Sequence, residues 1–379
     1  MLGEIALGLL LGGACGLIPG IHPNLVASLA GSVGWDAGAL SIVLASMYSA
    51  SIVFSFVPSV FFGIPEDASV ACALAGQRMA LGGKGISALK TMAASAALSA
   101  LIAAGAFGAS LAIYPAIYTV IGGFVKYILL ALSAALILRG RNPALSLAVF
   151  ASAGILGKLT LDSAIGDPFL PLFSGMFALS SILGSGGRAL PAQEDGPLWG
   201  GFPAYSALGA ALGLLSNLLP AIGSSAQIAA LASIFVPLGS LQYLATISSI
   251  SASQALFSLA SAVSIGKSRN GVTAWIAENT DISGSLGPLS AAFLAGAIVA
   301  ALIVYLCRTR IAALAGNGPQ GFGKIIAAYI FAVTFVIDGI PGVAVLGAAA
   351  MLGTAAIRLG AGRISLMGAI IVPTLVLLF

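Results

Sequence analysis

The sequence contains little charge. Charged residues make up 7% of its 379 residues, whereas 59% of the residues are hydrophobic. An average soluble domain carries about 25% charged residues, and a chain of this length with so few of them could not cover a surface that faces water. The composition therefore excludes an ordinary soluble protein and predicts an all-α polytopic membrane protein of the cell membrane.

Histidine and cysteine are also scarce. His22 is the only histidine, and Cys15, Cys72 and Cys307 stand alone in apolar stretches. A single histidine with scattered acids provides neither a metal cluster nor a nucleophile beside a base, so we expect no enzyme activity, no metal and no cofactor. The cysteines indicate no disulfide framework. The absence of a basic run with interleaved aromatic residues argues against nucleic-acid binding.

Glycine and proline are frequent, and they mark a repeat. The segment ALGLLLGGACGLIPGI, residues 6–21, returns 201 residues later as ALGAALGLLSNLLPAI, residues 207–222, with eight identical positions. Each copy is an apolar segment that a proline breaks, at Pro19 in the first and at Pro220 in the second. In membrane chains, matching proline- or glycine-interrupted segments in two halves indicate the binding site of a transporter.

The hydrophobic runs divide the chain into two halves. Residues 1–184 form repeat one, residues 202–379 form repeat two, and residues 185–201 form a polar linker. Each half begins with a broken hairpin that is too short to span comfortably. We expect both hairpins to be re-entrant, with their broken backbone buried in protein or lining a cavity. The about five predicted crossings of each half are 38–62, 91–112, 115–138, 143–157 and 163–183, and then 240–264, 286–306, 322–338, 341–357 and 364–379.

The basic residues indicate how the halves are oriented. Five crossings are an odd number, so the second half begins on the opposite side of the membrane from the first. If the loop with Arg139 and Arg141 is cytoplasmic, ten of the fifteen lysines and arginines lie inside, which is a positive-inside distribution. We therefore predict two inverted-topology repeats rather than parallel ones, with both termini outside.

The half-helices that follow the two breaks form the candidate substrate site. Their unpaired N–H groups carry about half a positive charge, and two such ends that face each other can bind an anion. His22 could hydrogen-bond the anion or exchange a proton, or it could only cap a carbonyl. The alternative for the whole motif is a pair of ordinary proline kinks. The predicted substrate-binding residues are Gly16, Pro19, Gly20, His22, Pro23, Asn24, Pro220, Ala221, Gly223, Ser224 and Ser225.

Charged residues elsewhere could pair with the substrate or with a coupling ion. Lys126 and Lys324 occupy matching Gly-Phe-x-Lys-x-Ile motifs, and they could contact the anion or snorkel to the membrane edge. Asp338, near the outer end of a predicted helix, could bind a coupling cation, for which Na⁺ or H⁺ is the candidate. Lys267 and Arg269 are predicted to lie in a solvated loop.

Three stretches of the chain match patterns of one transporter family. GLIPGIHP, residues 16–23, fits Gly-x-x-Pro-Gly-x-Gly-Pro except at His22. Residues 48–90 fit an Asn-Ile-Pro-Gly stretch followed by Asp-Gly-x-x-Met-Ala-x-x-Gly-x-Ala-Gly, with Ala75 in place of the aspartate. Residues 338–375 are similar to a closing pair of helices. In these stretches the chain resembles the large permease subunit of tripartite tricarboxylate transporters, the TctA family.

The resemblance implies a permease that works with a small membrane subunit and an extracytoplasmic solute-binding protein. Together with the hairpins, it favours a secondary transporter that moves an organic anion, a di- or tricarboxylate, by alternating access. The alternative is a translocase for a lipid-linked polyprenyl phosphate, whose broken-helix motif the hairpins also resemble. An ion channel is disfavoured, because no charged ring or filter motif is visible. The expected partners are the anion, membrane lipid and the two subunits, and a homo-oligomer stays open.

Overall fold

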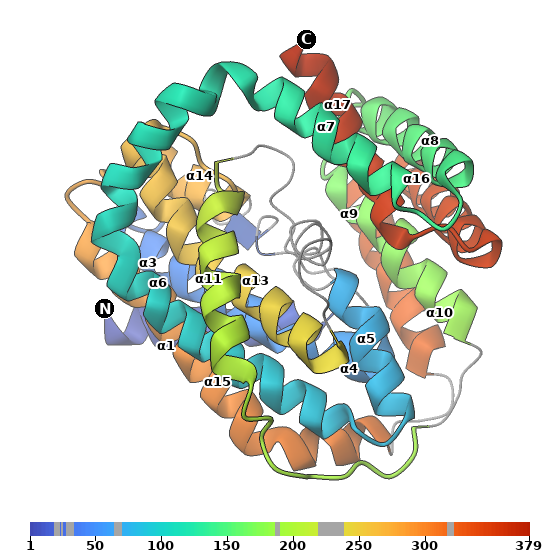
Figure 1. The fold of residues 1–379 in the computed structure, drawn as a ribbon, viewed down its shortest axis with the longest axis horizontal. Helices are drawn as coiled ribbons and strands as arrows, with labels where there is room; N and C mark the ends of the chain where they lie inside the picture. Colours follow the sequence, from blue (N-terminus) through green and yellow to red (C-terminus); the bar gives the residue numbers. More distant parts are fainter. Residues whose placement is uncertain are drawn as a thin grey trace.

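The described part of the chain is α-helical, and no β-strand occurs in it. The computed structural model describes residues 1–18, 23, 26–27, 34–63, 70–185, 190–218, 239–316 and 322–379 (Figure 1). Six helical segments in these ranges are long and apolar enough to cross a membrane, which confirms the prediction of an all-α protein with several membrane spans. These segments are Ala37–Phe62, Gly85–Leu138, Pro143–Leu161, Ser240–Ile265, Leu286–Gly316 and Lys324–Leu359.

The helices follow one another in a similar order in the two halves. The first half contains α1 (Leu2–Leu17), α3 (Ala37–Phe54), α4 (Phe56–Phe62), α5 (Val70–Leu81), α6 (Gly85–Ile121), the 3-10 turn η1 (Gly122–Phe124), α7 (Val125–Leu138), α8 (Pro143–Leu161), α9 (Phe169–Phe173), the π-helical turn η2 (Ser174–Leu179) and α10 (Ser180–Ser185). The second half contains α11 (Phe202–Ser216), α13 (Ser240–Ile265), α14 (Gly271–Asn279), α15 (Leu286–Gly316), α16 (Phe322–Leu359), η3 (Arg363–Met367) and α17 (Gly368–Leu378). Asparagine caps start two of them, since Asn142 and Asn270 accept the backbone N–H of Leu145 and Thr273.

The structure differs from several of the predicted crossings. The predicted crossings 163–183 and 364–379 fall on helical segments shorter than the six long ones, Phe169–Leu183 and Arg363–Leu378. The sequence predicts separate crossings over 91–112 and 115–138, but α6 continues through Pro115 to Ile121. The interruption lies instead at η1, where Gly122 and the glycine after it weaken the helix. Proline is tolerated inside membrane helices because neighbouring groups can satisfy the carbonyl that it leaves without a partner. A proline alone therefore does not mark the end of a crossing.

The helices α3 and α13 form the centre of the molecule. Most of their residues are buried, although both helices are rich in serine. Their hydroxyls donate to carbonyls one turn earlier in the same helix, as Ser46 does to Ile42 at 2.9 Å and Ser253 to Ser249 at 2.7 Å. Because most of these hydroxyls are satisfied within their own helix, and Ser249 donates to the Ser95 carbonyl of α6, these helices can be covered by protein.

The first helix of each half packs on the central helix of its own half in the same way. Gly8 of α1 touches α3 so closely that a Cβ atom there would overlap Ser46, and a Cβ atom on Gly209 of α11 would likewise overlap Ser249 of α13. Small residues allow two membrane helices to approach at backbone distance. The repeat of the sequence is thus also a repeat of packing.

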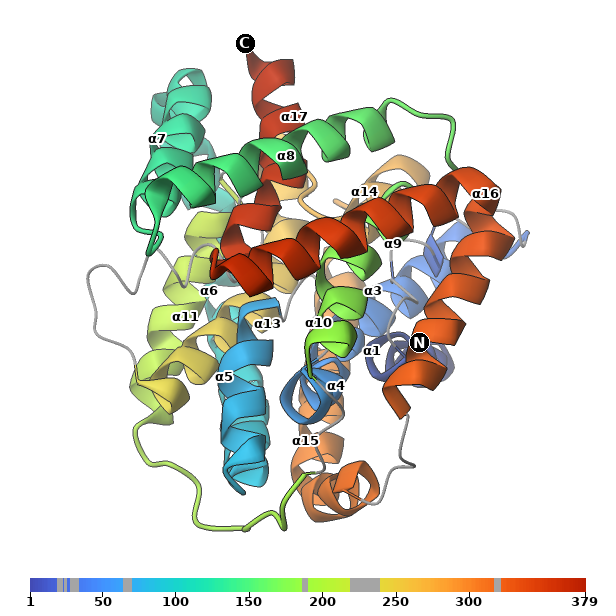
Figure 2. The ribbon, with the colours of Figure 1, turned by 90° about the vertical axis from the view of Figure 1, so that its right-hand side faces the viewer.

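The later helices of each half pack on the opposite half. α6 lies along α13, and α15 lies along α3. In the same reciprocal way, α8 packs on α17, and α16 packs on η2, α9 and α10. Figure 2 shows α8, α17 and α16 together, at the opposite end of the view from α15. Each half therefore covers apolar surface of the other, so that the two halves form one interlocked unit.

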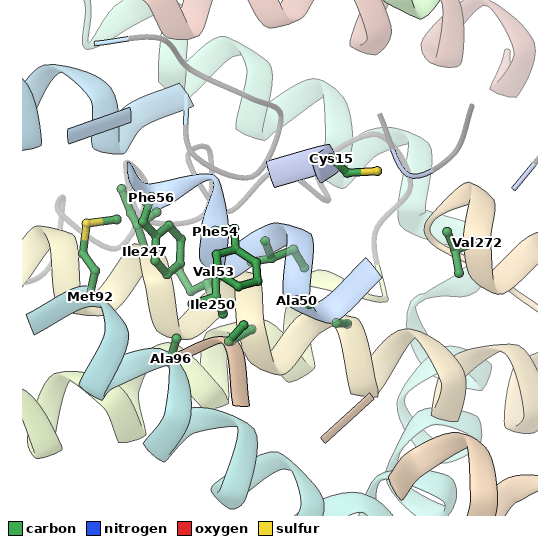
Figure 3. Close-up of a cluster of buried hydrophobic side chains, with 14 of the residues drawn as sticks. Cys15, Ala50, Val53, Phe54, Phe56, Met92, Ala96, Ile247, Ile250 and Val272 are labelled. Atoms are coloured by element: carbon green, nitrogen blue, oxygen red, sulfur yellow. The ribbon is translucent and has the colours of Figure 1, made fainter. Parts of the chain in front are cut away.

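Buried hydrophobic side chains fill the junction of the two halves (Figure 3). Val53 of α3, Phe56 of α4 and Met92 of α6 belong to one cluster with Ile247 and Ile250 of α13. All five side chains are fully buried. Burying a large apolar side chain stabilises a fold by about 1.5–3 kcal/mol. This cluster therefore stabilises the contact of α6 with the central helices.

The polar linker is attached to both long helices. The Asp195 carboxylate forms ion pairs with Lys90 of α6 at 2.6 Å and with Arg308 of α15 at 2.8 Å. Gln193 accepts a hydrogen bond from the backbone N–H of Gly85 at 2.7 Å. The hydrogen bonds from Arg308 and Lys90 hold the pKa of Asp195 below its usual range. The linker thus joins the start of α6 to the later part of α15.

We predict that Asp195→Asn releases the linker without unfolding the protein. Asp195 is partly exposed, so its ion pairs contribute only about 1 kcal/mol or less. Because its pKa is lowered, the carboxylate stays charged through the usual titration range of an aspartate, and only acid strong enough to protonate it below that range should have the same effect as the substitution. Hydrogen exchange of residues 190–196 should accelerate in this variant and not in Glu194→Gln. Equal exchange in both variants would contradict the attachment.

We also predict that Gly8→Ala and Gly209→Ala each destabilise the protein. The added Cβ atom would force the paired helices apart, which typically costs about 1–3 kcal/mol. Gly3→Ala is the matched control, because it lies in α1 with no atom within 4 Å of the added carbon. Thermal unfolding in detergent should show a lower midpoint for Gly8→Ala and Gly209→Ala and no loss for the control. A normal midpoint in either of the first two would contradict the close packing.

Candidate functional site

Most of the predicted substrate-binding residues lie outside the described residues. These are Pro19, Gly20, His22, Asn24, Pro220, Ala221, Gly223, Ser224 and Ser225. The structure describes the protein immediately before each break, at the ends of α1 and α11, together with Gly16 and Pro23. The candidate site is therefore built from these two helix ends and from the residues that contact them.

The end of α1 is apolar and tightly packed. Gly16 is buried, and a Cβ atom there would overlap the carbonyl of Ser51 and the side chain of Phe54 on α3. Ile18 has extended backbone angles, φ −103° and ψ 103°, as a residue before proline should. The helix thus ends directly before Pro19, where the sequence predicts the break. Pro23 is buried.

The end of α11 is polar, in contrast to the end of α1. Asn217 is fully buried, and its amide group donates to the carbonyls of Gly213 at 3.0 Å and of Gln254 on α13 at 3.3 Å. The hydroxyl of Tyr114 on α6 donates to the Leu214 carbonyl at 3.0 Å. The Oδ1 atom of Asn217 is buried without a partner among the described residues. A cluster of polar groups therefore surrounds the last turn before the second break.

Arg269 contradicts the prediction of a solvated loop. Its Nε donates to the carbonyl of Asn217 at 2.6 Å and its Nη2 to that of Leu218 at 3.1 Å, so it binds the C-terminal end of α11. A cation is favourable there because the unpaired carbonyls carry negative charge. Burial lowers the pKa of Arg269, yet a guanidinium stays charged in proteins. Lys267 of the same loop is exposed, as predicted.

The described part of the chain contains no carboxylate that pairs with Arg269. The residue thus places a partly buried positive charge within a few residues of Pro220. Sequence reasoning missed it because Arg269 and Asn217 are 52 residues apart. The only signal was an arginine in a short loop between two apolar segments, and a solvated loop has the same appearance.

The two matched lysines lie in different surroundings. The Nζ atom of Lys126 lies 4.7 Å from the centre of the Phe379 ring and 5.2 Å from that of Tyr127. Lys324 is exposed near the start of α16. Contact between an ammonium and aromatic rings is favourable by about 0.5–1 kcal/mol at exposed sites. This packing matches a lysine at the membrane edge better than a ligand of the substrate.

Asp338 lies at an internal break of α16. The residue after it, Gly339, has φ 62° and ψ −155°, which are not helical values. The Oδ1 atom of Asp338 accepts the backbone N–H of Asp167 at 2.8 Å, so the residue joins α16 to the connection between α8 and α9. Its Oδ2 atom is buried without a partner among the described residues. This location agrees with the predicted end of a crossing.

Comparison with known proteins supports one family. The chain matches the sequence profile of the "Tripartite tricarboxylate transporter TctA family" over residues 2–368. It is also similar to the "Uncharacterized protein MJ1079" of Methanocaldococcus jannaschii, at 27% identity over 187 residues, which are 47% of each chain. The chain thus spans about half the length of this relative. No solved structure matches the chain. Because the profile match covers nearly the whole chain, the protein belongs to the tripartite tricarboxylate transporter TctA family.

Proposed function

We propose that the protein is a permease that moves a di- or tricarboxylate across the membrane, and that the anion binds between the two broken hairpins. Membership of the family supports the coarser statement that the chain is a subunit of a membrane transport system. The observation that carries the finer statement is the position of Arg269. This arginine lies beside the second break and has no carboxylate partner in the described part of the chain.

A carboxylate at this break would be stabilised by two sources of positive charge, a half-helix N-terminus and Arg269. The half-helix after Pro220 would present unpaired N–H groups and the positive end of its dipole. Arg269 donates two of its N–H groups to the end of α11, and its remaining N–H groups can reach an anion in bidentate geometry. A buried charge without a counter-charge is unfavourable. An anionic substrate would supply the missing negative charge, so its binding would be electrostatically favourable.

We infer that the two halves are inverted repeats and that each hairpin is re-entrant. The matched packing of Gly8 and Gly209 and the reciprocal packing of α6 on α13 and of α15 on α3 support a structural repeat. The distribution of basic residues in the sequence supports its inversion, and the short apolar segments around the two prolines support re-entrance. Inverted repeats provide alternating access when parts of the two halves rock around a central site. The turn η1, which joins α6 to α7, is our candidate for a hinge.

The family also suggests partners for the permease. We expect a solute-binding protein to deliver the anion at the outer face and a small membrane subunit to accompany the permease. Binding of the anion to the isolated permease does not require either partner, so it provides the cleaner test. Polyprenyl phosphate is the competing ligand, because it offers the same negative charge on a lipid.

Substitutions in the two hairpins test whether they bind the anion. We expect citrate or succinate, and not polyprenyl phosphate, to raise the midpoint of thermal unfolding of the purified protein in a saturable way. Pro220→Ala and Asn24→Leu should each weaken this binding about tenfold or more, because each removes a determinant of a half-helix N-terminus. If both variants bind the acids as the wild type does, the hairpins are not the site. A response to polyprenyl phosphate alone would overturn the proposed substrate.

Substitutions of Arg269 test whether its charge binds the anion. Arg269→Gln removes the charge, while Arg269→Lys keeps the charge and loses the planar fork. Hydrogen bonds to charged groups are worth about 1.5–3 kcal/mol, so we expect citrate affinity to fall roughly 10- to 100-fold in Arg269→Gln, with a smaller loss in Arg269→Lys.

Lys267→Gln is the control for this prediction, because it removes an exposed charge from the same loop. Calorimetric titration at matched protein stability separates binding from folding. Unchanged citrate affinity in a folded Arg269 variant would mean that the arginine only caps α11.

A further inference from the structure

Two buried polar side chains share one face of α16. Asp338 is 8% exposed and Thr334, one turn earlier, is fully buried. The Oδ2 atom of Asp338 and the Oγ1 atom of Thr334 both lack a hydrogen-bond partner among the described residues. A buried polar group without a partner costs about 1–3 kcal/mol, and more when it is charged. Two such groups one turn apart therefore indicate a ligand that they share.

The backbone adds a third oxygen beside them. Gly339 has φ 62° and ψ −155°, a region essentially open only to glycine, and it interrupts α16 directly after Asp338. Pro341 has no N–H group, so it cannot donate the usual helical hydrogen bond to the Ile337 carbonyl four residues earlier. Interrupted membrane helices use such carbonyls to coordinate cations. Asp338, Thr334 and Ile337 thus offer a carboxylate, a hydroxyl and a carbonyl at one break.

The surroundings are negative rather than positive. The nearby Asp167 donates its backbone N–H to Asp338, while its own carboxylate accepts the N–H groups of Phe169 and Leu170 at the start of α9. No lysine or arginine in the described part of the chain pairs with Asp338. The nearest lysine in sequence to this loop, Lys158, already pairs with Asp162 at 2.6 Å. A cation is therefore the counter-charge that the site lacks.

Glycines pack closely against this face of the helix, where a larger residue would not fit. A Cβ atom on Gly342, one turn after Asp338, would overlap the Asp338 side chain and lie 3.3 Å from Thr334. Gly166, in the connection before α9, lies close to Asp338 Oδ1 as well. Gly166 also lies close to the Ile337 carbonyl, so glycines of both elements pack against the segment that carries Thr334, Ile337 and Asp338.

We propose that Asp338 Oδ2, Thr334 Oγ1 and the Ile337 carbonyl bind a sodium ion. All three ligands are hard oxygen donors, which suit alkali and alkaline-earth cations rather than transition metals. A single uncommitted carboxylate balances one positive charge, since the Asp167 carboxylate caps α9. One charge favours a monovalent ion over a divalent one.

The position of the site suggests what the ion does. Asp338 belongs to the second half, whereas Asp167, which it contacts, belongs to the first. A bound ion would stabilise the break of α16 against the connection between α8 and α9. Its role as the coupling ion rests on the proposed transport function, but the binding of sodium does not.

Sodium binding can be measured without any substrate. We expect NaCl, and not KCl at equal ionic strength, to raise the thermal midpoint of the purified protein in a saturable way, and radioactive sodium to bind at equilibrium. Asp338→Asn should abolish both effects, and Thr334→Val should weaken sodium affinity about tenfold. Asp162→Asn is the matched control, because it removes an exposed carboxylate from the same connection and should leave both effects unchanged.

Each outcome decides between the alternatives. Equal effects of sodium and potassium, or sodium binding that survives in Asp338→Asn, would overturn the site, and so would a response of the wild type to protons alone. If Asp338→Asn does not fold, the affinity of Thr334→Val decides. Sodium binding in a protein that binds no carboxylic acid would refute the proposed substrate and leave this site standing. If the protein binds a carboxylic acid but no sodium, only the sodium site is refuted.

Discussion

A membrane offers no water to the backbone, and this constraint decides where the chain can interrupt its helices. Each N–H or carbonyl group that a break releases must find a partner inside the protein. At the end of α11, Arg269 provides that partner for the carbonyls of Asn217 and Leu218. At the break of α16, Asp338 instead binds the connection from the other half through Asp167. The breaks are therefore placed where another element covers them, and these are the places where polar chemistry gathers.

The same constraint explains the interlocked packing. A broken segment is covered only if the helices around it are fixed, and the reciprocal contacts of α6 with α13 and of α15 with α3 fix them. Glycines such as Gly8 and Gly209 bring the backbones together, while most serine hydroxyls of the central helices donate to carbonyls of their own helix. The buried centre thus carries many polar side chains without offering a ligand site, so an unpartnered group such as Thr334 stands out.

Much of the fold was predictable because the bilayer imposes length and composition on each span. The apolar runs therefore predict the long spans and the ends of α1 and α11 before the two prolines, and the internal repeat predicts matched packing. The continuation of α6 through Pro115 was not predictable, because it depends on neighbours that satisfy the backbone. Arg269 and Asp338 have partners 52 and 171 residues away, and no local pattern links such positions. Local sequence thus predicted where α1 and α11 end, while the chemistry around these ends required the tertiary structure.

The two halves share a scaffold but differ in the residue that ends their first helix. Gly16 and Asn217 occupy matching positions of the repeat. Gly16 packs against the Ser51 carbonyl with no room for a side chain, whereas Asn217 donates to the carbonyl of Gln254, at the equivalent place on the other central helix. Among the described residues, an arginine binds the end of the first helix only in the second half, where Arg269 contacts α11. A symmetric pair of hairpins would bind an anion in two equivalent orientations. Under the proposed function, the polar and positive end of α11, together with the apolar end of α1, would give a bound anion one preferred orientation.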